Sequence, residues 1–342
     1  MRYLLPGTAL LVLLLSGCGS SSQDGVLRVQ VFTGAYSSIP VHVADELGFF
    51  AKHGLIVEKL PANSSSAALA AMIGGSLDVV ESAADLVMAN IDKGTELRYL
   101  MSNEGTNYVN VVVGNHVRVP GDARDYRNVF RALSGHRIGV NAIGSTVYLA
   151  AVMMIEDAGV DKDDVEFVAT GSAATTMSAW QSGSVDAQVT FAPVPELLET
   201  LGVAEPYFVL ADDGPLALRF DGLYGGWVTT AALLESRSDD ADAFIAAVIE
   251  AIDWIRSPDN QAELLEIARR HAPVSALSPT QNDVVLQKMI DRYRRFWGYE
   301  ISRDAIDKWN DYALHFGLVS KPIGFEQIVY SGAPVCEESP CQ

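Results

Sequence analysis

Short strand-like runs alternate with amphipathic stretches through the first two thirds of this chain, and this alternation limits the possible folds more than any other feature. The first block has strand-like runs at 27–32, 55–60, 78–81, 97–102 and 108–114, with helical stretches at 41–53, 66–74 and 84–93. The second block has strand-like runs at 136–141, 165–170, 186–191 and 207–211, with helical stretches at 146–158, 173–182 and 194–201. This order predicts two α/β blocks of similar layout with mainly parallel sheets, although no clear sequence repeat relates them.

After a last strand expected at 223–230, the pattern changes to helices alone. Apolar residues recur at spacings of three and four in 242–255, 258–271, 279–296 and 303–316. Pro258 and Pro279 suit the first turns of two of these helices. We expect Trp254, Trp297 and Trp309 to pack in the core rather than to contact a ligand.

The N-terminus has the order of an export signal. Arg2 precedes an apolar run at 9–15, and small residues lead up to Cys18. Leu15-Ser-Gly-Cys18 resembles the lipobox of bacterial lipoproteins, which implies a signal peptide at 1–17, a lipid such as palmitate on Cys18 and a polar tether at 18–25. The alternative is an ordinary export signal with a chance cysteine. The resemblance places the protein on the cell membrane by its lipid, facing the periplasm or the cell exterior.

Composition excludes several functional classes. The chain has 342 residues, of which 49% are hydrophobic, and its formal charge is −19; loss of 1–17, which holds Arg2 and no acid, makes the charge −20. So acidic a chain repels nucleic acid and anionic lipid headgroups. None of the six histidines stands in a metal-binding or nucleophile motif, so we expect neither catalysis nor a cofactor. No apolar run after the signal is long enough to span a bilayer.

The two remaining cysteines, Cys336 and Cys341, lie close together near the C-terminus. Exported proteins can form disulfides, so we expect a bond that pins the C-terminal tail; two free thiols are the alternative. A metal site is not expected, because two cysteines without a nearby histidine cannot complete a tetrahedral ligand set.

One stretch is more specific than a generic α/β pattern. It combines a proline, an Ala-x-x-x-Gly-Phe-Phe-x-x-x-Gly-Leu segment and a Gly-x-x-Asp turn at Pro40, Ala44, Gly48, Phe49, Phe50, Gly54, Leu55, Gly75 and Asp78. This pattern resembles the solute-binding proteins for nitrate, sulfonates, taurine and thiamine pyrimidine precursors. Three weaker matches follow at 133–140, 144–146 and 183–187, so the resemblance covers most of 26–235.

The resemblance implies a two-lobed type II periplasmic-binding-protein fold with C-terminal helices. Lobe 1 would hold 26–110 plus 221–342, and lobe 2 would hold 111–220. It further implies a monomer that captures a small molecule between the lobes, needs no cofactor, and has an ABC permease and its ATPase as partners.

Ligands of open α/β sheets bind outside the carboxyl ends of the strands. The candidate ligand-binding residues therefore lie on the loops that follow the strands, and the return strand adds two more. They are Tyr36, Ser37, Ser38, Glu81, Ser82, Asp85, Asn107, Ser145, Thr146, Thr190, Tyr224 and Trp227. Those with a hydroxyl group just before an expected helix could bind an anion with the helix N–H groups or could simply cap the helix.

The loops favour one kind of ligand over another. None of them contains Lys or Arg, and Glu81 and Asp85 lie among them, which weakens the case for an anion. Tyr36 and Trp227 could stack on a planar ring, whereas Phe191 and Tyr148 are better explained by core packing. We therefore favour a neutral or cationic heteroaromatic ligand, such as a pyrimidine or another vitamin precursor, with an aliphatic sulfonate, taurine or nitrate as the alternative.

Two other classes of function remain open. A ligand-sensing subunit would contact a receptor in place of a permease, and the sequence does not separate the two roles. A pyrimidine-forming enzyme of eukaryotes shares the implied fold, but the cysteine-rich motif of that enzyme is missing here.

Overall fold

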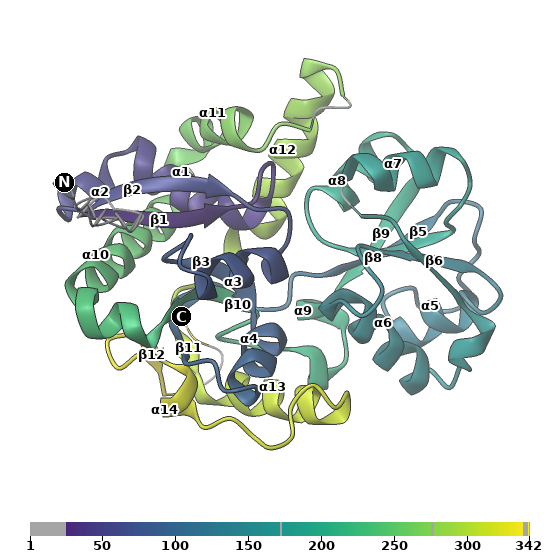
Figure 1. Ribbon diagram of the computed structural model, residues 1–342. Helices are drawn as coiled ribbons and strands as arrows, with labels where there is room; N and C mark the ends of the chain where they lie inside the picture. Colours follow the sequence, from purple (N-terminus) through teal and green to yellow (C-terminus); the bar gives the residue numbers. More distant parts are fainter. Residues whose placement is uncertain (1–24, 172, 275–276, 338–340, 342) are drawn as a thin grey trace, which may run out of the picture.

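The computed structural model describes residues 25–171, 173–274, 277–337 and 341, and Cys18 lies outside them. Two α/β lobes lie side by side, connected by two crossing segments (Figure 1). The strands of the first lobe are β1 (Val26–Val31), β2 (Ile56–Pro61), β3 (Val80–Ala83), β4 (Leu97–Glu104) and β10 (Gly225–Thr230). Those of the second lobe are β5 (Asn110–Gly114), β6 (Arg137–Val140), β7 (Glu166–Ala169), β8 (Ala187–Thr190) and β9 (Ala204–Val209).

The two sheets have the same topology. In the first lobe β1 is parallel to β2 and touches β3 through the Val29–Val79 bridge, and β10 lies antiparallel between β3 and β4. In the second lobe the order is β7-β6-β8-β5-β9, with β6 parallel to its neighbours and β5 antiparallel between β8 and β9. The sheets are therefore mixed rather than mainly parallel, because each takes in one strand that arrives from the other lobe.

Helices cover both sheets. The first lobe has α1 (Ile39–Glu46), α2 (Phe49–Lys52), α3 (Ser65–Ile73), α4 (Ala84–Asp92), α10 (Ala231–Arg256), α11 (Gln261–His271), α12 (Pro279–Tyr293), α13 (Arg303–His315) and α14 (Phe325–Ile328). The second lobe has α5 (Tyr126–Ala132), α6 (Thr146–Asp157), α7 (Ala173–Gln181), α8 (Val194–Thr200) and α9 (Leu210–Asp213). The single helix expected at 41–53 is two helices, because Gly48 takes the left-handed conformation with φ 74° between them.

Each Gly-x-x-Asp turn fastens its own sheet. Asp78 accepts hydrogen bonds from the backbone N, Nε and Nη2 of Arg28 at 2.8, 2.9 and 2.6 Å. Asp186 accepts the same three from Arg137 at 2.9, 3.1 and 3.1 Å. In each case the aspartate N–H donates to the arginine carbonyl at 2.8 Å. The repeat that the sequence hides is thus visible as two equivalent Arg–Asp clasps.

A disulfide joins Cys336 and Cys341 near the C-terminus. The short strands β11 (Ile301–Ser302) and β12 (Val335–Cys336) pair beside it. Trp297 and Trp309 are fully buried core residues.

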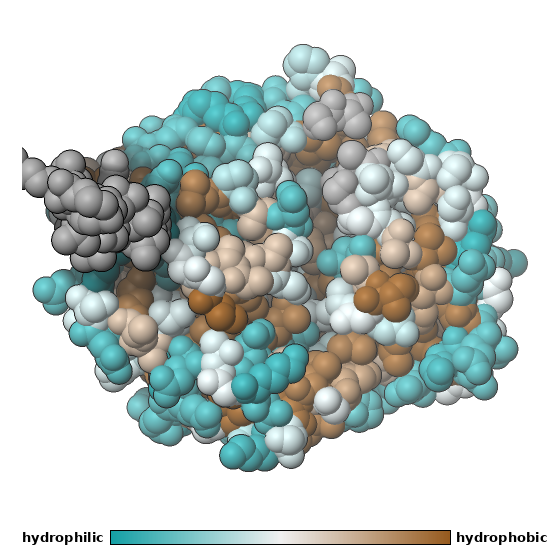
Figure 2. Space-filling view, viewed as in Figure 1, coloured by the Kyte–Doolittle hydropathy of each residue, from teal (hydrophilic) through white to brown (hydrophobic). Residues whose placement is uncertain are grey.

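Within the described ranges, no helix has both the length and the apolar character that a membrane crossing requires. The space-filling view shows a recess between the two lobes (Figure 2).

Candidate ligand-binding site between the lobes

Two buried carboxyl groups lie on either side of Gly225, at the end of the first sheet that leads to the second lobe. Gly225 pairs with Ala83 of β3 and Glu104 of β4, and Trp227, two residues on, pairs with Glu81. A β-carbon at Gly225 would lie 2.6 Å from Glu104 Oε2 and 3.0 Å from Glu81 Oε1. The missing side chain therefore makes room for the two carboxyls to meet above the strand between them.

Few donors reach this carboxyl pair. The Ser37 hydroxyl donates to Glu81, and Asn103 Nδ2 donates to Glu104 Oε1 at 3.2 Å and to the Ser37 carbonyl at 2.8 Å. Among the described residues, buried Glu104 Oε2 has no hydrogen-bond partner apart from the Glu81 carboxyl. A carboxyl can bond to a carboxylate only through a proton, so the two groups share one.

The protonation of the pair follows from its burial. Desolvation raises the pKa of Glu81 to about 7, opposed by the bonds from Ser37 and Glu104. Burial, and then the charge of Glu81, raise the pKa of Glu104 well above its ordinary value. Two carboxylates so close and so dry cannot both ionise near neutral pH.

Aromatic rings enclose the carboxyl pair. Tyr108, in the crossing segment after β4, lies at the centre of the group, with its ring centroid 5.2 Å from Tyr36, 5.7 Å from Tyr224 and 6.0 Å from Phe191. Tyr36 also stacks on Trp297 at 4.0 Å. Phe191 follows β8 of the second lobe, so the group takes rings from both lobes and from the hinge.

Polar contacts close the lobes beside these rings. Thr146 Oγ1, at the start of α6, donates to Asp85 Oδ2 on α4 at 2.6 Å. The hydroxyl of Tyr312 on α13 donates to the Thr146 carbonyl at 3.1 Å. Burial raises the pKa of Asp85, and the bond from Thr146 opposes that effect. One residue of the second lobe thus holds two residues of the first.

The structure brings together six of the residues predicted from the sequence and gives most of the others local roles. The six around the carboxyl pair and the lobe junction are Tyr36, Ser37, Glu81, Asp85, Thr146 and Tyr224. Ser38 Oγ accepts from the Phe32 N–H, and Ser82 Oγ donates to the Ala83 carbonyl. Asn107 bonds to Leu218 and Val109. Ser145 caps α6. Thr190 is buried at the end of β8.

Trp227 does not line the site as predicted. Its side chain is fully buried, its ring packs edge-on to Phe244 of α10 at 5.5 Å, and its Nε1 donates to Asn103 Oδ1 at 3.2 Å. The ring and the N–H group of the indole both have partners within the core. Its link to the site is indirect, through the Asn103 side chain that also holds Glu104.

Two residues at the centre of the site were missed. Glu104 is the last residue of β4, and Tyr108 lies in the crossing segment that follows, where the sequence predicts only Asn107. The available signal was an acid and a ring four residues apart, at the end of the strand and in the crossing segment. Phe191, which was assigned to core packing, also contacts this group.

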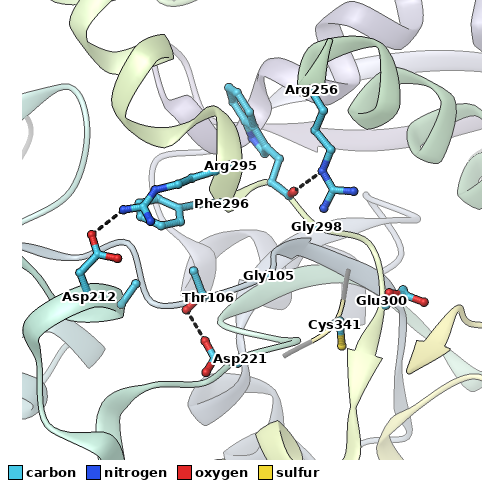
Figure 3. Close-up of a pocket in the computed structure, with 12 residues that line it drawn as sticks. Gly105, Thr106, Asp212, Asp221, Arg256, Arg295, Phe296, Gly298, Glu300 and Cys341 are labelled. Carbon is cyan, nitrogen blue, oxygen red and sulfur yellow. Dashed lines mark hydrogen bonds and ion pairs between the residues drawn. The ribbon is translucent and has the colours of Figure 1, made fainter. Parts of the chain in front are cut away.

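A separate cavity of about 330 Å³ lies at the hinge (Figure 3). Thr106 donates to Asp221 at 2.7 Å, which ties the two crossing segments together, and Arg295 pairs with Asp212 at 2.5 Å. None of the sequence-predicted ligand-binding residues lines this cavity, although Cys341 does. Another hollow, of about 610 Å³, lies beside α14.

Among the described residues, no group of His, Cys, Asp and Glu is suited to hold a metal ion.

Several solved structures share this architecture. The periplasmic aliphatic sulphonate binding protein SsuA from Escherichia coli is 15% identical, with a TM-score of 0.71 over 90% of this chain and 98% of that chain. The periplasmic nitrate-binding protein NrtA from Synechocystis is 16% identical, with a TM-score of 0.64 over 89% and 84%. A Candida albicans protein described as having the generic periplasmic binding protein fold is 16% identical, with a TM-score of 0.64 over 92% and 98%.

These likenesses establish the fold, and they agree with the two-lobed periplasmic-binding-protein fold expected from the sequence. Two of the three neighbours are named as binding proteins. No curated protein matches the chain. The model of the NMT1-like family matches residues 31–269, more than half of the sequence. The chain therefore belongs to the NMT1-like family.

Proposed function

We propose that this protein is the extracytoplasmic substrate-binding protein of an ABC importer, anchored to the membrane by a lipid on Cys18. It captures a small organic ligand between its lobes and presents the closed form to a permease and its ATPase. The observation that carries the proposal is the bond between Asp85 of the first lobe and Thr146 of the second, together with the contact of Phe191 from the second lobe with Tyr108 at the hinge. Residues from two lobes meet this way where closure encloses a ligand.

The site favours a heteroaromatic ligand, such as a pyrimidine or another vitamin precursor. Tyr36, Tyr108 and Tyr224 offer ring faces and edges to a planar molecule. Glu81 and Ser37 offer polar atoms to its rim. Ser145 and Thr146, at the start of α6, would suit an aliphatic sulfonate, taurine or nitrate, which is the second candidate class.

The test is a thermal-shift screen on the chain from residue 19 onward, which keeps every described residue. The panel holds pyrimidines, vitamins, aromatic acids, sulfonates, taurine and nitrate. A ligand that binds only the folded state raises Tm in step with its concentration over Kd. We expect a shift from a ring compound that is lost in Tyr108→Ala; a shift from sulfonates alone would move the ligand to the second class, and no shift at all would contradict the binding function.

The anchor has its own test. The full chain, expressed in a bacterial host, should fractionate with the membrane, and Cys18→Ser should release it or leave it unprocessed. Retention of Cys18→Ser with unchanged mobility would contradict lipidation. A ligand-sensing role is separated from import by uptake: deletion of an importer's binding protein abolishes uptake of the ligand, whereas deletion of a sensor subunit changes only a response to it.

A further inference from the structure

The carboxyl pair lacks a positively charged partner among the described side chains. Among the described residues, neither Glu81 nor Glu104 has a Lys, Arg or His within ion-pair distance, and Glu104 Oε2 has no partner apart from the Glu81 carboxyl. Asp85 adds a third buried acid nearby. An acidic group in such a place needs a proton or another positive charge.

The surrounding tyrosine rings also favour a positive charge at this site. The rings of Tyr36, Tyr108 and Tyr224 lie near the pair. Burial and then the negative charge of the nearby acids raise the pKa of each phenol, so all three stay neutral. The electron-rich face of a tyrosine attracts a cation, most strongly where water is excluded. Rings of this kind next to two carboxyls form a cage suited to a positive head group, and they disfavour an anion by both charge and quadrupole.

We propose that the ligand of this site is an organic cation, one that places a planar N–H donor group between Glu81 and Glu104 within the three tyrosine rings. The inference rests on the proposed binding function and narrows it to one charge class. An amidinium or a protonated amino-heterocycle has two N–H donors in one plane, enough to reach both carboxyls. When such a cation binds, the proton shared by the carboxyls leaves to the buffer, and the positive charge at the site is conserved.

Three probes of matched shape test the head-group charge. Benzamidinium is a cation, benzamide is its neutral counterpart, and benzenesulfonate is an anion on the same ring. Isothermal titration of the chain from residue 19 onward should show benzamidinium binding at least roughly tenfold more tightly than the other two, because hydrogen bonds to charged groups are the stronger ones. Equal or tighter binding of benzamide or benzenesulfonate would overturn the proposal while leaving the binding function in place.

Two matched variants test whether Glu104 causes the preference for the cation. Glu104→Gln keeps the shape of the side chain and should abolish the preference for the cation, whereas Glu58→Gln, on the exposed face of β2, should leave it intact. A preference that survives in Glu104→Gln, with the fold unchanged by circular dichroism, would contradict the assignment. Failure of all three probes would also overturn it; the broad ligand panel then decides separately whether the binding function stands.

Proton release provides a readout on the unmodified chain. The ionisable and charged groups near the pair are Tyr36 before α1, Asp85 on α4, Tyr99 on β4, Tyr108 and Tyr224 on the crossing segments, and Arg256 at the end of α10. Burial raises the pKa of each of these tyrosines, so they stay neutral near pH 6.5 and the carboxyls are the source of any released proton. Titration in buffers of different ionisation enthalpy should give release of up to about one proton per benzamidinium and none per benzamide; zero release for both would contradict the displacement.

Discussion

The hydroxyl of Tyr293 on α12 donates to Oε1 of Glu196 on α8 at 2.8 Å, across the junction of the two lobes. The Tyr293 carbonyl in turn accepts a hydrogen bond from the Tyr36 hydroxyl at 2.6 Å. A ring of the candidate site is therefore one residue away from a bond that holds the lobes together. Arg292 also pairs with Glu196 at 2.5 Å, and the Glu196 side chain is fully buried.

This junction predicts that Glu196→Ala opens the protein. The closed form of the variant would leave the Tyr293 hydroxyl and Arg292 without their buried acceptor, whereas the open form lets water solvate both groups. We expect a larger radius of gyration by small-angle scattering and a ligand affinity lowered by roughly tenfold or more. Glu199→Gln is the control, because Glu199 is partly exposed and its pairs contribute little; equal effects of both variants would contradict the latch.

The carboxyl pair predicts a pH dependence of stability. The pKa of Glu81 is raised by burial to about 7, so the folded state holds its proton more tightly than the unfolded state does. The stability that this provides is complete below pH 4 to 5 and is lost as the pH rises through 7. Urea denaturation between pH 5 and pH 8 should show falling stability, and Glu81→Gln should flatten that fall; a steeper fall in the variant would contradict the assignment.

Gly225 predicts a steric effect. In Gly225→Ala the new methyl group would meet Glu104 Oε2 at 2.6 Å and Glu81 Oε1 at 3.0 Å, and the carboxyls would have to move apart. We expect a loss of about 1–3 kcal/mol in the free energy of unfolding, together with weaker ligand binding. Gly324→Ala is the matched control, because a β-carbon there meets nothing within 4 Å. Similar Tm values for the two variants would show that the pair has more room than the structure gives it.

The hydrogen bonds between Asp186 and Arg137 predict that removal of the Asp186 carboxylate destabilises the second lobe. Burial by itself raises the pKa of Asp186, but the bonds from Arg137 outweigh it and hold the pKa at about 2. A downward shift of this size corresponds to about 2 kcal/mol of stability at pH 7, lost as the pH falls from 4 toward 2. Asp186→Ala should lower the free energy of unfolding by at least that amount at pH 7, and the difference from the unmodified chain should shrink at pH 3. An unchanged denaturation curve at pH 7 would contradict the role of the clasp.

The sequence predicted the α/β alternation because periodicity and glycine positions are local signals. Gly54 turns the chain between the expected helical stretch at 41–53 and the expected strand at 55–60, whereas Gly48, with the same φ of 74°, divides that helical stretch into two helices. The order of strands was not readable, because β10 pairs with β3 and β4 from more than 120 residues away. The contact between Glu81 and Glu104 could not be predicted for the same reason, because β10 inserts between the strands β3 and β4 that carry them.

Trp227 shows why the surroundings of a single side chain could not be predicted from the sequence. Alternation along β10 places it on the same face as Gly225, and that face carries both the carboxyl pair and, farther along, the packing of α10. Local sequence gives the face of a strand but not what covers each position on it. A ring two residues from the site thus lies in the core. Tyr108, in contrast, falls at the start of the strand expected at 108–114, but it lies before β5 and at the centre of the site.

The two Arg–Asp clasps are each contained in one half of the molecule, and neither reaches across the seam. Parting the halves breaks Asp85–Thr146 and Glu196–Tyr293 but leaves Asp78–Arg28 and Asp186–Arg137 in place. Each half can therefore turn as a rigid body about the crossing segments. The energy of that motion comes from these bonds and from the apolar packing of α8 against α12 at the seam, and a bound molecule can replace the bonds one by one.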